Sequence, residues 1–238
     1  MWIGFERKGL VKLSAVSIKS GQYDFEQIGA EDGLNNITIT SILPDDRGLI
    51  WIGTNGRGAF KYANGELTNY RYRNGLESDV VLSIAQDRSG NIWFGTSGSG
   101  VIKFSDEIFT YYYNVPGLSN GNIFAICEDG DKNIWVGTST NGAYRYAANA
   151  NGNPEVKHFN TDNGLIGSNV RAILKDRKDN LWFATENGVC KFNGSTFTSF
   201  STRNGLAGNQ IKSLMEDEDG NIWFGTYGNG VIKYNGAT

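Results

Sequence analysis

Residues 205–226 read GLAGNQIKSLMEDEDGNIWFGT, and this stretch decides the fold because related copies of it recur along the chain. The copy at 75–96 reads GLESDVVLSIAQDRSGNIWFGT. Tryptophans fix the register of the copies: they stand at positions 2, 51, 93, 135, 182 and 223, which are 49, 42, 42, 47 and 41 residues apart. A period of about 40–50 residues built from short strand-like runs is typical of a β-propeller blade.

Each copy reads as four short strands. Around Trp93, runs rich in Val, Ile, Phe and Tyr cover 81–85, 91–95, 101–104 and 109–112, and Gly, Asn and Asp bound them. No segment shows a sustained helical period. The sequence therefore predicts an all-β fold, a β-propeller of about six four-stranded repeats whose first and last units are incomplete.

We expect one propeller domain over residues 1–238. Its repeat units would cover roughly 1–31, 32–73, 74–115, 116–162, 163–203 and 204–238. The first unit begins at its second strand and the last unit ends after its third strand. The sequence therefore predicts three strands in the first unit, four in each of the next four units, and three in the last. The open blade edges would pair within one ring or with a second chain, so a homo-oligomer is an alternative.

The residues common to the copies have a structural interpretation. An Asp stands six residues before each of the last five tryptophans, where it would accept backbone N–H bonds in a tight hairpin. The tryptophan would pack blade on blade, with an indole N–H that needs a partner. The Gly after it would let strands approach closely, and the following Thr would bond within the blade. Because catalytic groups are not normally copied into every blade, function would reside where the copies differ.

Composition narrows the function classes. The net charge is −3 and Lys and Arg form no basic run, so nucleic acid is not an expected partner. We expect no membrane segment, since no stretch approaches 18 consecutive apolar residues, and no signal peptide at the start of this chain. Cys127 and Cys190 fall in different repeats and are expected to be unpaired thiols.

The spacing of Gly205-Leu206, Leu214, Asp217 and the run 220–226 resembles the repeat of the two-component regulator propeller family, and 75–96 fits as closely. In that family such repeats form the periplasmic sensor region of bacterial hybrid histidine kinases, often ones that respond to glycans. The resemblance implies a non-catalytic, ligand-sensing or protein-binding propeller, with a glycan or a protein as partner and a periplasmic location.

Binding residues are expected on the loops that enter each first strand and on those between second and third strands, which should share one face. Asn, Ser and Gly in these loops also suit plain turn geometry. Turn chemistry does not require Arg57, Arg171, Glu186 or Tyr227, and amide, guanidinium and aromatic groups suit sugars. The candidate ligand-binding residues are Arg57, Arg171, Glu186, Tyr227, Asn36, Asn120, Phe124 and Lys212.

Other functions are weaker alternatives. The second hypothesis is an architectural or engineered propeller fragment that assembles through its open blade edges, and the third is a propeller lyase or hydrolase. We predict no catalytic residue, because the single His158 falls on an outer strand and no nucleophile or metal motif is present. A glycosidase would need two facing carboxylates, and Glu128 and Glu216 read as ordinary strand-end charge. No cofactor or metal is expected; calcium at 128–133 or 216–221 is the alternative.

Overall fold

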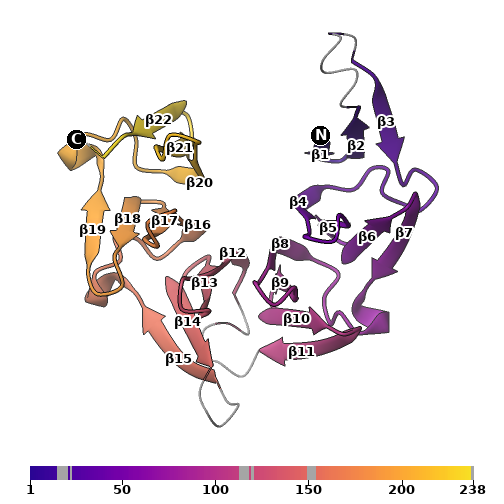
Figure 1. The fold of residues 1–238 in the computed structure, drawn as a ribbon, viewed down its shortest axis with the longest axis horizontal. Coiled ribbons are helices and arrows are strands. Elements are labelled where there is room, and N and C mark those ends of the chain that lie inside the picture. The colour runs from indigo at the N-terminus through magenta and orange to yellow at the C-terminus, as the bar shows by residue number, and fades with distance from the viewer. Residues whose placement is uncertain (15–20, 22, 113–117, 119–120, 149–153, 237–238) are drawn as a thin grey trace. The chain divides into compact units, whose positions relative to one another are not determined.

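The computed structural model describes residues 1–14, 21, 23–112, 118, 121–148 and 154–236. In these ranges the regular structure consists of 22 strands and three 3-10 turns, which confirms the all-β class (Figure 1). The chain divides into two compact units, Met1–Tyr112 and Tyr113–Thr238. In the described ranges no helix has the length and hydropathy needed to cross a membrane. The single domain remains a prediction.

Unit 1 contains three antiparallel sheets, each ordered as the strands follow in sequence. The first sheet has three strands: β1 (Trp2–Phe5), β2 (Gly9–Leu13) and β3 (Phe25–Ile28). The second has four: β4 (Ile39–Pro44), β5 (Ile50–Thr54), β6 (Ala59–Ala63) and β7 (Glu66–Tyr70). After η1 (Tyr72–Asn74), the third contains β8 (Val81–Gln86), β9 (Ile92–Thr96), β10 (Val101–Ser105) and β11 (Ile108–Tyr112).

Unit 2 repeats the same design. Its first sheet contains β12 (Ile123–Glu128), β13 (Ile134–Thr138), β14 (Ala143–Ala148) and β15 (Pro154–Phe159). After η2 (Thr161–Asn163) come β16 (Val170–Lys175), β17 (Leu181–Thr185), β18 (Gly188–Phe192) and β19 (Phe197–Phe200). After η3 (Thr202–Asn204), a three-stranded sheet contains β20 (Ile211–Glu216), β21 (Ile222–Thr226) and β22 (Val231–Tyr234). The predicted series of three, four, four, four, four and three strands is therefore confirmed within the described residues.

The repeated Asp closes the hairpin between the first and second strands. Asp176 Oδ1 accepts the backbone N–H groups of Lys178 at 2.9 Å and Asn180 at 2.8 Å, and its Oδ2 accepts the indole N–H of Trp182 at 2.9 Å. The same Asp–indole bond, 2.7–3.0 Å long, recurs in the other four copies. The predicted turn role is confirmed, and the Asp also supplies the partner that the indole needs.

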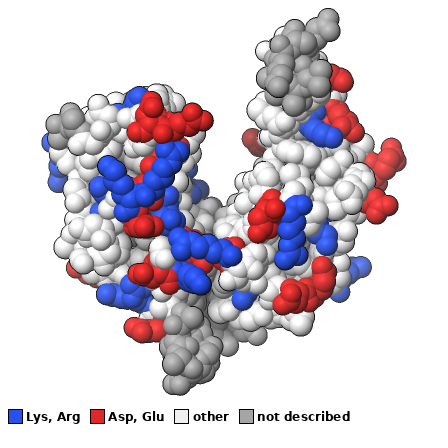
Figure 2. All heavy atoms as spheres, in the orientation of Figure 1, with Lys and Arg blue, Asp and Glu red and all other residues white. Residues whose placement is uncertain are grey.

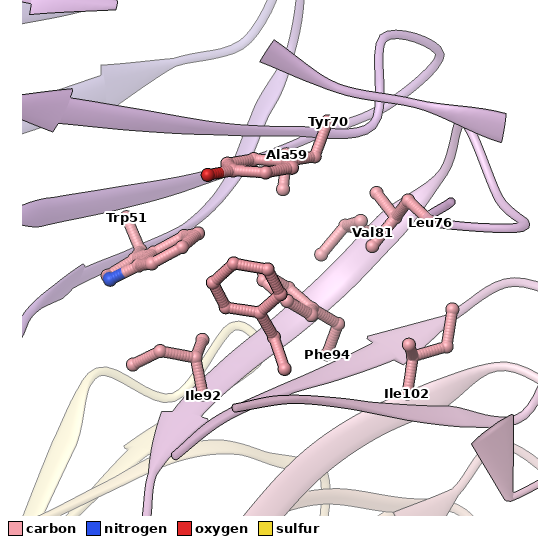
Figure 3. Packing of buried hydrophobic residues seen from close by; sticks show 9 residues of the cluster. Trp51, Ala59, Tyr70, Leu76, Val81, Ile92, Phe94 and Ile102 are labelled. Atoms are coloured by element: carbon pink, nitrogen blue, oxygen red, sulfur yellow. The ribbon is translucent and has the colours of Figure 1, made fainter. Parts of the chain in front are cut away.

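Each core lies between successive sheets, as the blade-packing interpretation predicts. Trp51 on β5 is 3% exposed, and its ring centroid lies 5.7 Å from that of Phe94 on β9 and 5.5 Å from that of Phe104 on β10. Figure 3 shows the rings and aliphatic side chains of this cluster facing one another between the strands. Because one face of a lone sheet would stay exposed, stacking buries the apolar face of each repeat.

The small residues that follow the tryptophan act as expected. A Cβ atom added to Gly137 would lie 2.7 Å from Cγ1 of Val170, so only glycine allows β13 to approach β16 this closely. The hydroxyl of Thr138 donates to the carbonyl of Gly142 at 2.9 Å, within one blade. Both interpretations from the sequence are confirmed at these positions.

Candidate binding surface

Five of the six repeats have a first strand, and a β-bulge interrupts each of these five strands. The pairing register of β4, β8, β12, β16 and β20 with the following strand skips one residue in each case. A bulge sets two residues against one and re-aims the extra side chain. The skipped residues are Thr40, Leu82, Phe124, Arg171 and Lys212. The copies therefore carry side chains of different chemistry at a position that their shared hydrogen bonding sets apart.

In unit 2, the bulge residues and one loop residue form two pairs of cation and ring. The guanidinium carbon of Arg171 lies 4.0 Å from the centroid of Phe124, and Nζ of Lys212 lies 5.2 Å from that of Tyr227. Phe124, Arg171 and Lys212 lie on β12, β16 and β20, which lie against one another in order, and Tyr227 follows β21. Each pair contributes roughly 0.5–1 kcal/mol at an exposed site. The four residues Phe124, Arg171, Lys212 and Tyr227 are called the bulge cluster below.

The two cations of the bulge cluster have no acidic partner among the described residues. At the other end of β16, Lys175 Nζ lies 3.0 Å from Asp179 Oδ1, and just after β20, Asp217 Oδ2 lies 3.9 Å from Nζ of Lys233 on β22. Figure 2 shows one face of the molecule, on which basic and acidic side chains lie interleaved. The bulge cluster therefore has an excess of positive charge, whereas at the other end of the strands the positive charges are paired with acids.

Glu186 serves the backbone. Its Oε1 accepts the N–H of Ser168 at 3.1 Å and its Oε2 accepts the N–H of Asn169 at 3.0 Å. Both groups belong to the loop that enters β16, while Glu186 lies between β17 and β18. The two kinds of loop therefore share one end of the blade, as the sequence predicts. With each oxygen already occupied, Glu186 fits a positioning role better than direct contact with a ligand.

The other candidates lie elsewhere. The guanidinium of exposed Arg57 lies against Gly33, where an added Cβ atom would approach Nη1 to 2.6 Å. Asn36 has a φ of 60°, so left-handed turn geometry accounts for this residue. It also lines a depression of about 420 Å³ in unit 1 with Phe5, Lys8, Val11, Gln27 and Asn35. Asn120 lies outside the described residues.

The third strands carry a feature that the sequence reasoning missed. A cation lies over the tryptophan ring in all six repeats, with its charged centre 5.2–5.9 Å from the centroid. These residues are Lys12, Lys61, Lys103, Arg145, Lys191 and Lys233, each the cross-strand partner of its tryptophan. Their constant spacing, nine or ten residues after the tryptophan, was the available signal. Because they recur in every repeat, they act in the scaffold.

The residues considered for catalysis and metal binding have structural partners. His158 lies on the outer strand β15, where its Nε2 is 2.6 Å from the carbonyl of Asn141 and its ring stacks on Tyr144. Asp217, in one of the acidic turns, bonds Asn221 and Trp223. In the described ranges no three His, Cys, Asp or Glu residues are grouped to hold a metal ion. Cys127 and Cys190 are free thiols, as predicted.

Comparison with known structures identifies the fold as a β-propeller. The extracellular domain of a hybrid two-component system from B. thetaiotaomicron aligns over 99% of this chain with 24% identity and a TM-score of 0.83. PorZ, a surface component of the type IX secretion system of Porphyromonas gingivalis, aligns over 98% with 18% identity and a TM-score of 0.75. The chain spans about a third of each, 32% and 36%.

A third structure is a catalytically inactive histidine-to-alanine variant of virginiamycin B lyase from Staphylococcus aureus, with quinupristin. It is 17% identical and has a TM-score of 0.63, and the alignment covers 85% of this chain and 71% of the lyase. All three identities lie below 25%, so these similarities establish the fold alone. No curated protein matches the sequence.

The family follows from the repeats themselves. The family model described as "Two component regulator propeller" matches residues 33–56, 75–98, 117–140, 164–187 and 205–228, which together make up half of the 238 residues. This chain belongs to the two component regulator propeller family.

Proposed function

We propose that this chain is the ligand-sensing propeller of a two-component regulator and that it binds a carbohydrate at the bulge cluster without catalysis. The observation that carries the proposal is the pairing of cations with ring faces at the residues that the bulges set apart. Tyr227 is 69% exposed, so its ring can cover the face of a sugar. Guanidinium and ammonium groups donate hydrogen bonds that hydroxyl and carboxylate oxygens accept.

Membership of the family and the likeness to an extracellular domain support a sensor role on the outer side of the bacterial membrane, in the periplasm. The signalling output would come from other parts of a longer regulator. A protein that docks on the same face is the alternative partner.

A binding role fits the surface better than a lyase or hydrolase role. The lyase among the similar structures has an inactive variant that lacks a histidine. Here, His158 lies on an outer strand and bonds a backbone carbonyl. Glu216, one of the acids considered for a glycosidase, accepts the backbone N–H of Arg177 at 3.0 Å. Neither residue is placed as a free acid or base.

The test is a binding screen against a panel of oligosaccharides by isothermal titration calorimetry, with Tyr227→Ala and Phe124→Ala as variants. Loss of a stacking ring should weaken binding by roughly tenfold, which corresponds to about 1.4 kcal/mol. Tyr72→Ala is the matched control, because Tyr72 is 67% exposed but lies in unit 1. Equal affinity in all four proteins, or no binding of any member, contradicts the proposal.

The architectural alternative rests on β22. Within the described residues, this strand is the outer strand of a three-stranded sheet, and its Val231 is 65% exposed. An unpaired apolar edge favours pairing with another chain. Light scattering over a hundredfold range of concentration tests this role: a mass that rises with concentration supports assembly, and a constant monomer mass excludes it.

A further inference from the structure

We infer that the ligand of the bulge cluster is an acidic saccharide whose carboxylate is bound between Arg171 and Lys212. This inference rests on the proposed function and names the chemical class of its ligand. A neutral sugar would need only the rings and hydrogen-bond donors, so the inference depends on the charge of the two cations.

The arrangement of charge in the bulge cluster favours an anionic ligand. Arg171 and Lys212 occupy the same repeat position on β16 and β20, which lie against each other in unit 2. Like charges at neighbouring positions repel one another, and no acidic group among the described residues pairs with either cation. An anion placed between them would remove this repulsion and gain attraction from both.

The charges of the bulge cluster differ from nearby charges, several of which have partners. Two other basic side chains of β16 and its turn have partners: Lys175 pairs with Asp179, and Arg177 Nη1 donates to the carbonyl of Glu218 at 2.7 Å. The acid at the loop end, Glu186, accepts backbone N–H groups with both oxygens. The loop end therefore contains an acid that is already occupied and two cations without an acidic partner.

The geometry of the two cation–ring pairs also favours a carboxylate. The guanidinium carbon of Arg171 lies 4.0 Å from the ring centroid of Phe124, so stacking restricts the rotamers of Arg171 before a ligand arrives. A guanidinium held in this way can present two parallel N–H groups to a carboxylate. Lys212 lies beside the exposed ring of Tyr227, which places a second positive charge next to a surface on which a sugar ring can stack.

The experiment compares acidic oligosaccharides with their own neutral forms. The probes are trigalacturonate, trimannuronate and a hyaluronan tetrasaccharide, each against its methyl ester, which keeps the backbone and removes the charge. Titration calorimetry would be run at 50 mM and 300 mM salt on wild type, Arg171→Gln, Lys212→Gln and Arg171→Lys. Arg203→Gln is the matched control, because it removes one exposed positive charge from the same unit.

We expect at least one acidic probe to bind and its methyl ester to bind at least tenfold more weakly. Arg171→Gln and Lys212→Gln should each weaken binding of the acid by about tenfold, Arg171→Lys by less, and Arg203→Gln by less than twofold. Higher salt should weaken the acid more than the ester. Circular dichroism and thermal melting of each variant would show that the fold is retained.

Two results separate this inference from the proposed function. If methyl esters or neutral oligosaccharides bind as well as the acids and binding still depends on Tyr227, the sensor function stands and the acidic ligand is wrong. If no saccharide of either kind binds, both fail. An acid that binds equally well to wild type, Arg171→Gln and Lys212→Gln overturns the assignment of the site.

Discussion

Replacing Trp182 by Ala tests the account of blade packing, because the chain offers a matched control at the same repeat position. The indole of Trp182 is 1% exposed and lies between its own sheet and the next, with ring centroids 5.9 Å from Phe224 and 5.3 Å from Tyr234. A buried Trp side chain removes about 150–250 Å² from water, which at about 25 cal/mol/Å² amounts to roughly 4–6 kcal/mol. Large-to-small substitutions of core aromatics cost about 3–5 kcal/mol, so we expect Trp182→Ala to destabilise unit 2 by about 4 kcal/mol.

The control is Trp223→Ala. Trp223 makes the same bond to its turn Asp at 2.8 Å, but its side chain is partly exposed. Its loss should therefore be less than half that of Trp182. Because repeat proteins can unfold in steps, urea titration followed by circular dichroism would be combined with hydrogen exchange of peptides from β16 to β21. A loss below about 1 kcal/mol for Trp182→Ala, or equal losses in both variants, would refute the argument.

Four further predictions concern other parts of the fold. In urea titrations, Glu186→Ala should destabilise the loop that enters β16 by about 1–2 kcal/mol, because two backbone N–H groups lose their acceptor. Glu186→Gln should destabilise it less, since one acceptor oxygen remains. Equal effects of the two substitutions contradict this. In thermal melting, Gly58→Ala should lower the Tm more than Gly230→Ala does. Both glycines have φ near +70°, but only at Gly58 would an added Cβ atom meet a carbonyl oxygen, 2.1 Å away. Equal shifts in Tm contradict this. Burial raises the pKa of Asp176, but hydrogen bonds from Trp182 and Asn180 lower it more, so the net pKa lies below the ordinary 3.8. The ionised Asp176 carboxylate therefore stabilises the fold above about pH 4, and this stabilisation is lost as the pH falls below that value. In acid titrations monitored by circular dichroism, Asp176→Asn should lose less stability at low pH than wild type does. The same loss of stability at low pH in both proteins contradicts this. Burial raises the pKa of the Cys127 thiol to about 11, so native protein at pH 8 should react with iodoacetamide far more slowly than urea-unfolded protein does, as followed by mass spectrometry; equal rates contradict this.

The spacing of the repeats and the hairpin chemistry could be predicted because they depend on residues close together in sequence. The turn Asp and its tryptophan are six residues apart, within one hairpin, so each copy repeats the same local bonds. The strands, their order within each sheet and the thiol state of the cysteines followed from the same pattern. The Asp–indole bond and the cation over each tryptophan were equally local, and their constant spacing made them predictable in principle.

The candidate site was predictable only in part. Phe124, Arg171 and Lys212 were recognised at the starts of first strands, and Arg171 and Tyr227 as residues that turn chemistry does not require. The structure joins the four into two pairs of cation and ring in unit 2. The sequence could not assign Glu186 to backbone N–H groups, because that assignment depends on how two loops of one blade meet. For Asn36, the left-handed backbone gives a conformational reason that residue type alone only suggests.

The sequence by itself determined the repeat, the all-β class and the family, because a period near 42 residues with fixed local spacings admits few folds. Only the tertiary structure decided which residues of different repeats share a surface. Phe124 and Arg171 are 47 residues apart, and their contact depends on the bulges in β12 and β16 and on the packing of those strands. That packing is set by side chains buried between sheets, whose combined burial no local pattern records.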